Sequence, residues 1–395
     1  MPTRSPCFGA FVATALVSGL LGGCGDYVVG PPPEAADPLD LPANVYDEDA
    51  GAPTPENRAE RSIDAGRNGD GGADAAPAVV VPAWEMPPTG VPAATGRGRV
   101  LFLHPDGMFR RVEAVQGGVV ENVGAALNRL SPGVDSRMTQ SKDGALIVGE
   151  TTRFGCSTPC LAVFGADLAS GGRVTRGGEP IRIGATPPVI AAGGRLIVFA
   201  SAGAHSLDLY SITRPADPTL GWSKARLLTA TSPMAWNHRP SLSPDQTKVV
   251  FDCGADADGT EATSVCEVGV DGAGFRVVAR PAAPLTNLHN PSYDADGSIV
   301  FEGEGATVIN GVTGKGERIH RVAAQTPAPT PLAPTYTNDN TPCVLPSGNV
   351  VSLWLGRQGN AQGGHELKLM SNKGQFLGMI AQGFDIRDVG LSCGN

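Results

Sequence analysis

The strongest constraint on the fold is a sequence pattern that returns about every 50 residues. A short strand, a tight turn of Pro, Asp or Gly, and an apolar, β-branched strand recur five times between residues 137 and 352. The last positions of the five copies are 148, 199, 251, 301 and 352, so the intervals are 51, 52, 50 and 51 residues. A period this regular is typical of repeat architectures, in which each unit buries its apolar face against the next.

Two further short strands follow the pattern in most copies, which makes four antiparallel strands per repeat. They are expected at residues 207–212 and 225–228, 265–268 and 275–278, and 366–370 and 376–380. Four antiparallel strands in about 50 residues describe one blade of a β-propeller. The 53 Gly and 34 Pro residues exceed a fifth of the 395-residue chain and disfavour long helices, coiled coils and helical repeats.

The two ends of the repeat region are expected to complete one more blade. Residues 388–395 resemble a first strand with its turn, whereas residues 99–104 and 108–112 supply later strands. A closed ring leaves no long unpaired strand edge. The sequence therefore predicts an all-β fold, a six-bladed propeller over residues 97–395, closed by N- and C-terminal strands that share a blade.

The repeat has a recognisable signature in its clearest copy. Residues 240–251 read Pro-x-x-Ser-Pro-Asp-x-x-x-Val-x-Phe, which resembles the repeat of TolB-type β-propellers. The copy at 291–301 is also close, whereas the copy at 188–199 has Gly193-Gly194 in its turn and the copy at 341–352 lacks the final aromatic residue. The resemblance implies a propeller that works in a complex of the bacterial envelope.

The N-terminus has the features of an export signal. Arg4 precedes an apolar stretch from Phe8 to Leu21, and Leu21-Gly22-Gly23-Cys24 is similar to the processing site of bacterial lipoproteins. In that family the cysteine thiol carries the lipid, so the resemblance implies a signal peptide over residues 1–23 and lipidation of Cys24. Gly25 after the cysteine favours the outer membrane. An ordinary cleaved signal or a buried helix remains the alternative.

Residues 24–96 are expected to form a disordered tether. From residue 25 onward this segment holds thirteen acidic and three basic residues among many Pro, Ala and Gly. Low hydrophobicity combined with one sign of charge cannot offset the entropy lost on folding. The acidity of the chain, with its net charge of -9, therefore belongs to the tether, and the repeat region is neutral. This balance excludes a nucleic-acid binder that works through a basic face.

Six cysteines remain after Cys7 and Cys24 are set aside, an even number that suits an oxidising compartment. Cys156 with Cys160, and Cys253 with Cys266, are each expected to pair across one loop. Cys343 and Cys393 would then join the first strands of neighbouring blades, although their registers look offset and this pairing stays open. A metal cluster or a catalytic thiol is the less favoured interpretation of these cysteines.

Candidate binding residues lie just before the first strands of the blades. His238 and His289 occupy equivalent places in consecutive repeats, and equivalent places in a propeller converge on one mouth of the channel. The predicted mouth set is His238, Arg239, His289, Asn290, Asn340 and Asp135. Ordinary loop capping is the alternative role for these side chains. Trp236 lies next to the set and is the aromatic residue that we consider as a candidate ligand contact.

These observations favour a non-catalytic envelope lipoprotein whose propeller binds a protein or a small ligand. The expected partners are a membrane, through the lipid on Cys24, and an envelope protein; the domain is expected to be monomeric and to need no metal or other cofactor. The competing hypothesis is a metal-assisted lyase or hydrolase of polysaccharide or cell-wall material. Oligogalacturonate lyases build a histidine-based metal site on a similar repeat, but no third convergent histidine is visible here.

Overall fold

The computed structural model describes residues 98–395, except for several short segments. The segments outside the description are residues 116, 184–185, 218–220, 261, 310–311, 325, 333–338, 355–365 and 382–386. The predicted signal peptide, Cys24 and the predicted tether all lie outside the described residues.

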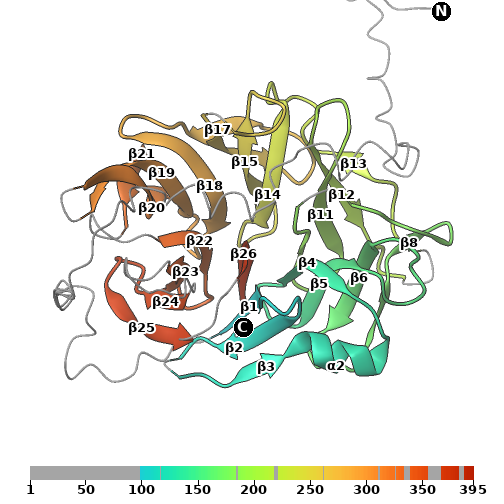
Figure 1. Cartoon of the computed structure of the whole chain (residues 1–395). Helices are drawn as coiled ribbons and strands as arrows, with labels where there is room; N and C mark the ends of the chain where they lie inside the picture. The colour runs from blue at the N-terminus through green and yellow to red at the C-terminus, as the bar shows by residue number, and fades with distance from the viewer. Residues whose placement is uncertain are drawn as a thin grey trace, which may run out of the picture. The chain divides into compact units, whose positions relative to one another are not determined.

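Six four-stranded antiparallel sheets surround a central channel, as the repeat predicts (Figure 1). The closing blade contains β26 (Arg387–Gly394), β1 (Arg99–Leu103), β2 (Phe109–Glu113) and β3 (Val120–Asn122). The next blade contains β4 (Asp135–Gln140), β5 (Leu146–Thr151), β6 (Cys160–Gly165) and β7 (Gly171–Arg173). A hairpin of β8 (Thr175–Arg176) and β9 (Glu179–Pro180) follows it. The first strand named for each blade is the innermost one.

The other four blades follow in chain order. The third consists of β10 (Val189–Ile190), β11 (Leu196–Ser201), β12 (Asp208–Thr213) and β13 (Arg226–Leu227). The fourth consists of β14 (Trp236–Leu242), β15 (Lys248–Gly254), β16 (Ser264–Gly269) and β17 (Arg276–Ala279). The fifth consists of β18 (Leu285–Tyr293), β19 (Ile299–Ile309), β20 (Val312–Ala323) and β21 (Thr326–Pro331). The sixth consists of β22 (Asp339–Val344), β23 (Val350–Trp354), β24 (Glu366–Met370) and β25 (Phe376–Ala381).

The second strand of each repeat copy is buried on both faces. In β15, Val249, Val250 and Phe251 have no exposed surface, and Phe199 of β11 and Phe301 of β19 are equally buried. β-Branched and aromatic side chains suit such strands, because they pack well on a pleated surface covered from both sides. This is why the apolar strand is the most regular part of the sequence repeat.

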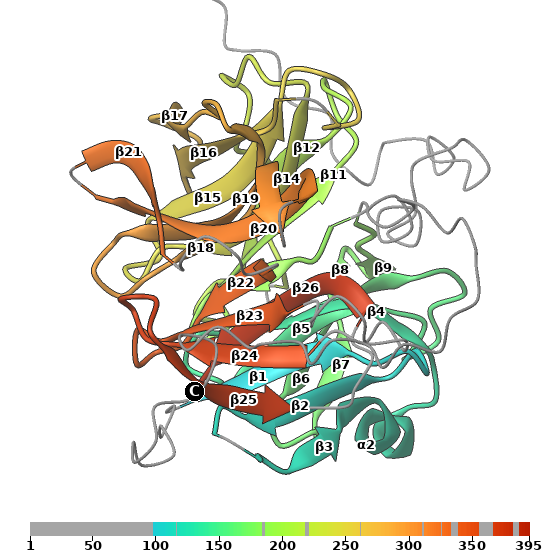
Figure 2. The ribbon, with the colours of Figure 1, turned by 60° about the vertical axis from the view of Figure 1, so that its left-hand side comes forward.

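The two ends of the described chain share one blade, as expected. β26 pairs antiparallel with β1, with Cys393 opposite Val100 and Ser392 opposite Leu101. Figure 2 shows β26 between β22 and β4, where the last blade meets the first. The Gln140 side chain of β4 secures this closure, because its amide nitrogen donates to the carbonyl oxygens of Arg99 (2.8 Å) and Ser392 (2.7 Å).

Three disulfides join the cysteines of the repeat region. Cys156 pairs with Cys160 and Cys253 with Cys266, which confirms the two expected loop pairings. Cys343 of β22 pairs with Cys393 of β26, with Cα atoms 5.5 Å apart, which resolves the pairing that the sequence left open. This third bond links the last full blade to the closing strand.

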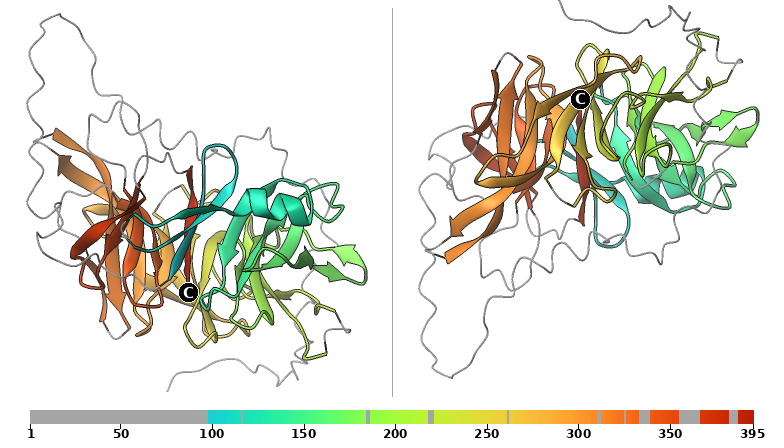
Figure 3. Two further views of the ribbon diagram at one scale, coloured as in Figure 1. Left: turned by 90° about the horizontal axis from the view of Figure 1, so that it is seen from below. Right: turned by 90° about the horizontal axis from the view of Figure 1, so that it is seen from above.

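One helix interrupts the β architecture. Helix α2 (Val123–Leu130) lies between the closing blade and β4, and Figure 3 shows it beside the strands of those blades. The Asn122 side chain caps the helix by accepting a hydrogen bond from the backbone N–H of Ala125. Val123 and Leu127, on the inner face of the helix, are fully buried. Within the described part of the chain, no helix has the length and apolarity needed to cross a membrane.

Candidate functional site: the mouth of the central channel

Four innermost strands carry the same β-bulge at the channel mouth. The register of β4, β14, β18 and β22 against its partner strand shifts at corresponding places. In each bulge one residue other than glycine has positive φ: Arg137 (52°), Arg239 (46°), Asn290 (53°) and Thr341 (47°). Such a backbone costs of the order of 1–3 kcal/mol and re-aims the neighbouring side chains, so the inner strands change direction in the same way at four equivalent places.

The bulge sends consecutive residues in different directions. Arg239, Asn290 and Thr341 line the channel, whereas the residues directly before them, His238, His289 and Asn340, are not among its lining residues. His238 pairs opposite Asp252 and His289 opposite Glu302. The two predicted histidines therefore do not point together into the channel.

Both histidines instead meet one buried carboxylate. Asp252 Oδ2 lies 3.7 Å from His238 Nδ1 and 3.5 Å from His289 Nδ1, although the histidines belong to different blades. The side chain of Asp252 is 1% exposed, that of His289 4% and that of His238 15%. The cluster formed by His238, Asp252 and His289 thus ties the fourth blade to the fifth.

Asp252 is held as a carboxylate in this cluster. Burial alone would raise its pKa, but the hydrogen bonds and charges of His238 and His289 outweigh burial and lower the pKa below its usual range. The other carboxylate oxygen, Oδ1, is buried without a hydrogen-bond partner among the described residues.

A second chain of contacts runs from blade to blade at the same level. Arg239 Nη1 donates to Asn290 Oδ1, and Asn290 Nδ2 donates to Glu302 Oε2 at 2.7 Å. The same Glu302 oxygen accepts the backbone N–H of Thr341 at 2.9 Å. Three consecutive blades are therefore joined through their bulges, which gives the mouth a rigid rim.

The remaining mouth positions differ in their contacts. Arg137 Nη1 donates to Glu150 Oε2 at 2.7 Å, and Ser136 Oγ donates to the same oxygen at 2.9 Å. Asn340, at the place equivalent to the histidines, is 3% exposed, and its Oδ1 has no hydrogen-bond partner among the described residues.

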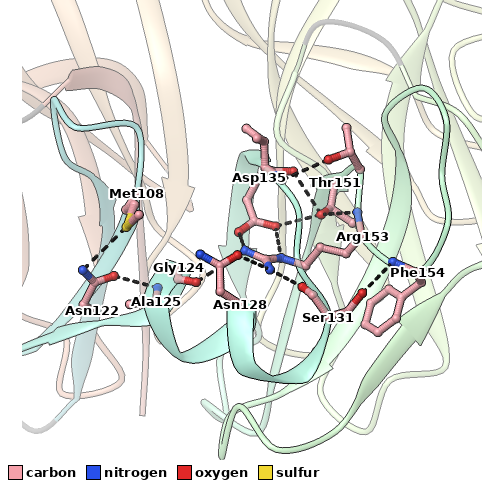
Figure 4. A network of polar contacts seen from close by, with 12 residues as sticks. Met108, Asn122, Gly124, Ala125, Asn128, Ser131, Asp135, Thr151, Arg153 and Phe154 are labelled. Atoms are coloured by element: carbon pink, nitrogen blue, oxygen red, sulfur yellow. Dashed lines mark hydrogen bonds and ion pairs between the residues drawn. The ribbon is translucent and has the colours of Figure 1, made fainter.

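The structure places Asp135 away from the other residues of the predicted mouth set. Asp135 lies one residue before the position that matches His238 and is not among the residues that line the channel; its side chain points to Arg153 (Figure 4). It pairs with Arg153 through Nε (2.8 Å) and Nη2 (2.6 Å), and Arg153 also donates to Asn128 Oδ1 and the Ser131 carbonyl oxygen at the end of α2. Asp135 is thus part of the anchor of the helix.

Trp236 packs locally rather than presenting a flat face for a sugar. Its ring stacks on His238 with centroids 4.5 Å apart. It also packs against Gly259, where φ is +65° and an added Cβ would lie 2.4 Å from the indole ring. The loop around Gly259 is closed internally, because Thr260 donates to Asp256 and Asp258. Trp236 thus holds an acidic hairpin against the mouth.

Thr263, His289 and Asp252 superficially resemble a catalytic chain. Thr263 Oγ1 lies 3.3 Å from His289 Nε2, and His289 Nδ1 lies 3.5 Å from Asp252. However, Thr263 has no exposed surface, so a substrate cannot reach its hydroxyl in this conformation. The described residues also contain no group of three or more His, Cys, Asp or Glu side chains placed to hold a metal ion.

The channel itself encloses about 100 Å³. Residues from all six innermost strands or their adjoining loops line it, with Arg239 and Asn290 as the members of the predicted set. Ligand pockets for drug-sized molecules enclose about 300–1,000 Å³, so this channel suits only a small group.

Several residues of the mouth were not singled out from the sequence. Glu150, Asp252 and Glu302 each stand two residues after the central valine of a second strand, in Val148-x-Glu, Val250-x-Asp and Val300-x-Glu. This acidic position is visible once the repeats are aligned. Arg137 and Thr341 follow from the same alignment, because they match Arg239 and Asn290.

The structure is similar to propellers of known structure. TolB from Acinetobacter baumannii matches with a TM-score of 0.53 and 15% identity, over 77% of this chain and 68% of that one. The chain has the fold of a TolB-type β-propeller. A putative TolB from Agrobacterium tumefaciens matches with a TM-score of 0.44 and 16% identity, over 73% of this chain and 90% of the other.

An enzyme with a related architecture gives a weaker match. An oligogalacturonate lyase from Vibrio parahaemolyticus aligns with a TM-score of 0.40 and 11% identity, over 64% of this chain and 73% of that one. No protein-family model matches the sequence, and no curated protein matches it. At these identities the similarity to the TolB-type propellers concerns the fold.

Proposed function

We propose that the protein is a cell-envelope lipoprotein whose propeller is a non-catalytic scaffold that binds a partner protein at the bulged mouth. The observation that carries this proposal is the rim formed by Arg239, Asn290 and Glu302, because contacts between blades fix it before any partner arrives. A rigid rim loses little entropy on binding, which favours docking of another surface. The fold similarity to TolB propellers is consistent with an envelope role.

The metal-assisted lyase or hydrolase receives less support from this geometry. Both candidate ligands, His238 and His289, face the buried Asp252 carboxylate and hold two blades together. A polysaccharide chain would also need more room than the channel of about 100 Å³ provides. We therefore propose binding rather than catalysis.

Lipid anchoring is tested on the predicted acceptor. The Cys24→Ser variant is expected to move from the detergent phase to the aqueous phase on phase partition, because it lacks the thiol that would carry the lipid. The Cys7→Ser variant serves as the matched control and should partition like the natural chain. Retention of Cys24→Ser in the detergent phase would argue against a lipid anchor.

Partner binding is tested by site-specific photocrosslinking in intact cells. A photoreactive residue at Arg137, a bulge position of the mouth whose side chain is 38% exposed, is expected to capture a defined envelope protein. The same residue at Arg226, which is exposed on the outer strand β13, is the control and should not capture it. Equal capture at both positions, or none at the mouth, would contradict a docking role for this face.

A further inference from the structure

One hairpin of the fifth blade projects from the ring on the side of the mouth. Strands β19 and β20 pair continuously as far as Ile309 opposite Val312. β19 thus continues seven residues beyond Glu302, about 23 Å of strand. The matching strands of the other repeat copies end one or two residues after the matching position, at Thr151, Ser201, Gly254 and Trp354. Figure 3 shows the hairpin, in orange, extending from the ring on the side away from the C-terminus.

Neither neighbouring strand follows this hairpin to its end. On one side, β18 begins at Leu285, which pairs with Gly305 of β19. On the other side, β21 pairs with β20 no further than His320. Among the strands that the structure describes, none pairs with residues 306–309 on the side that β18 leaves open.

The register determines which backbone groups of this stretch face outward. The carbonyl oxygen of Ile319 accepts a backbone N–H from outside the hairpin at 2.8 Å, and Ile319 stands opposite Glu302. This pair therefore turns its backbone groups outward, and the direction alternates along an antiparallel pair. The N–H and C=O groups of Ala306 and Val308 consequently face away from β20, whereas those of the residues that alternate with them bond to it.

The open edge of β19 lacks the charges that commonly protect a free strand edge. Residues 305–309 read Gly-Ala-Thr-Val-Ile, with no charged residue and three β-branched residues that favour strands. The opposite stretch of β20 and its continuation contain Lys315, Glu317 and Arg318. An uncharged free edge is a template for pairing with another strand, whereas a charged edge resists such pairing. The edge of β19 is therefore the better template of the two.

We propose that the open edge of β19 accepts an extended segment of the partner protein, which continues the fifth blade where β18 is missing. The inference rests on the proposed docking at the mouth and specifies how the partner binds. The added strand bonds to the outward N–H and C=O groups of Ala306 and Val308, as in recognition modes that extend a sheet. Four backbone groups are few for a stable complex, which favours a partner that also contacts the rim over a second copy that pairs through the edge alone.

The first test examines the edge in the purified full chain. In hydrogen exchange followed by NMR, the amide protons of Ala306 and Val308 should exchange at least tenfold faster than those of Thr307 and Ile309. Only the second pair of amides donates within the hairpin, and such bonds slow exchange. Equal rates at the four positions, or slow exchange at Ala306 and Val308, would overturn the open edge.

The second test removes one backbone donor from the edge. The Val308→Pro variant loses the outward N–H but no hydrogen bond of the hairpin, so its stability should match that of the control variant Val308→Thr. With the photoreactive residue at Arg137, capture of the envelope protein should fall at least fivefold in Val308→Pro and stay unchanged in Val308→Thr.

The outcomes separate strand addition from the proposed function. Equal capture at Arg137 in Val308→Pro and Val308→Thr would overturn strand addition and leave docking at the mouth intact. Absence of capture at Arg137 in the natural chain would overturn both. A photoreactive residue at Thr307 should capture the same protein as one at Arg137. A crosslinked product of two copies of this chain would instead overturn the assignment of the edge to a partner.

Discussion

At the scale of single residues, the bulge explains why sequence position alone misplaces side chains at the mouth. One extra residue on the inner strand separates His238, which faces Asp252, from Arg239, which faces the channel. On a regular strand, adjacent side chains would also point to opposite faces. In the bulge, however, the residue with positive φ changes the direction of the strand, and no local sequence pattern indicates this change. The equivalent histidines were correctly matched to each other, whereas their common target, Asp252, became visible only in the structure.

The Asp252 cluster predicts an acid-sensitive junction between two blades. The native carboxyl has a lowered pKa, so its contribution to the free energy of unfolding is complete above the unfolded value of about 3.9 and decreases as pH falls below it. The Asp252→Asn variant should lose about 1–3 kcal/mol at pH 7, because it leaves both histidines without their charged acceptor. Its stability should also fall less steeply than that of the natural chain below pH 4.

Urea unfolding at a series of pH values measures both effects. The Asp258→Asn variant, in the exposed hairpin loop, is the control and should follow the natural chain at each pH. Parallel pH profiles for Asp252→Asn and the natural chain would mean that the carboxylate does not bind the two blades together.

At the scale of elements, the strands were predictable and the helix was not. Each blade repeats an apolar strand after a fixed turn, so five copies reinforce one another even where a single copy is weak. Helix α2 occurs once. Its signals were present, with Asn122 as a cap and Val123, Ala126, Leu127 and Leu130 on one face, but an eight-residue helix between two repeats carries too little periodicity to stand out.

The anchor of α2 predicts an unequal cost for two arginine substitutions. Arg153 is 1% exposed and bonds both oxygens of Asp135 as well as the end of the helix, so Arg153→Met should destabilise the fold by about 3–5 kcal/mol through the buried charge that it leaves. Arg276→Met removes a guanidinium that is 52% exposed and pairs with Glu267, and should cost at most about 1 kcal/mol. Unfolding in guanidinium chloride measures both losses of stability, and equal losses would contradict the role of Arg153 as the anchor of α2.

At the scale of the whole molecule, the ring depends on contacts between the ends of the repeat region. β26 supplies the innermost strand of a blade whose other strands come almost 300 residues earlier. The repeat count and the resemblance of residues 388–395 to a first strand were enough to predict this closure. The Cys343–Cys393 bond that secures the closure could not be predicted in the same way. A disulfide depends on the relative height of two strands along the channel, and the bulge in β22 alters the height of Cys343.

Ring closure predicts that the three disulfides differ in what they contribute. The Cys343–Cys393 bond closes 50 residues, and loss of both cysteines to serine should cost about 4 kcal/mol in the free energy of unfolding if the bond acts mainly on chain entropy. The Cys156–Cys160 bond spans four residues and should contribute about 2 kcal/mol or less by the same reasoning. Unfolding in guanidinium chloride of the two double-serine variants provides the comparison.

The variant that lacks Cys343 and Cys393 should also open at the junction of β26 with β1, which hydrogen exchange detects as faster exchange at Val100 and Leu101 than in the other blades. If both variants lose equal stability and the junction exchanges like the rest of the ring, closure rests on the strand pairing alone, and the covalent link adds nothing that the sheet does not already provide.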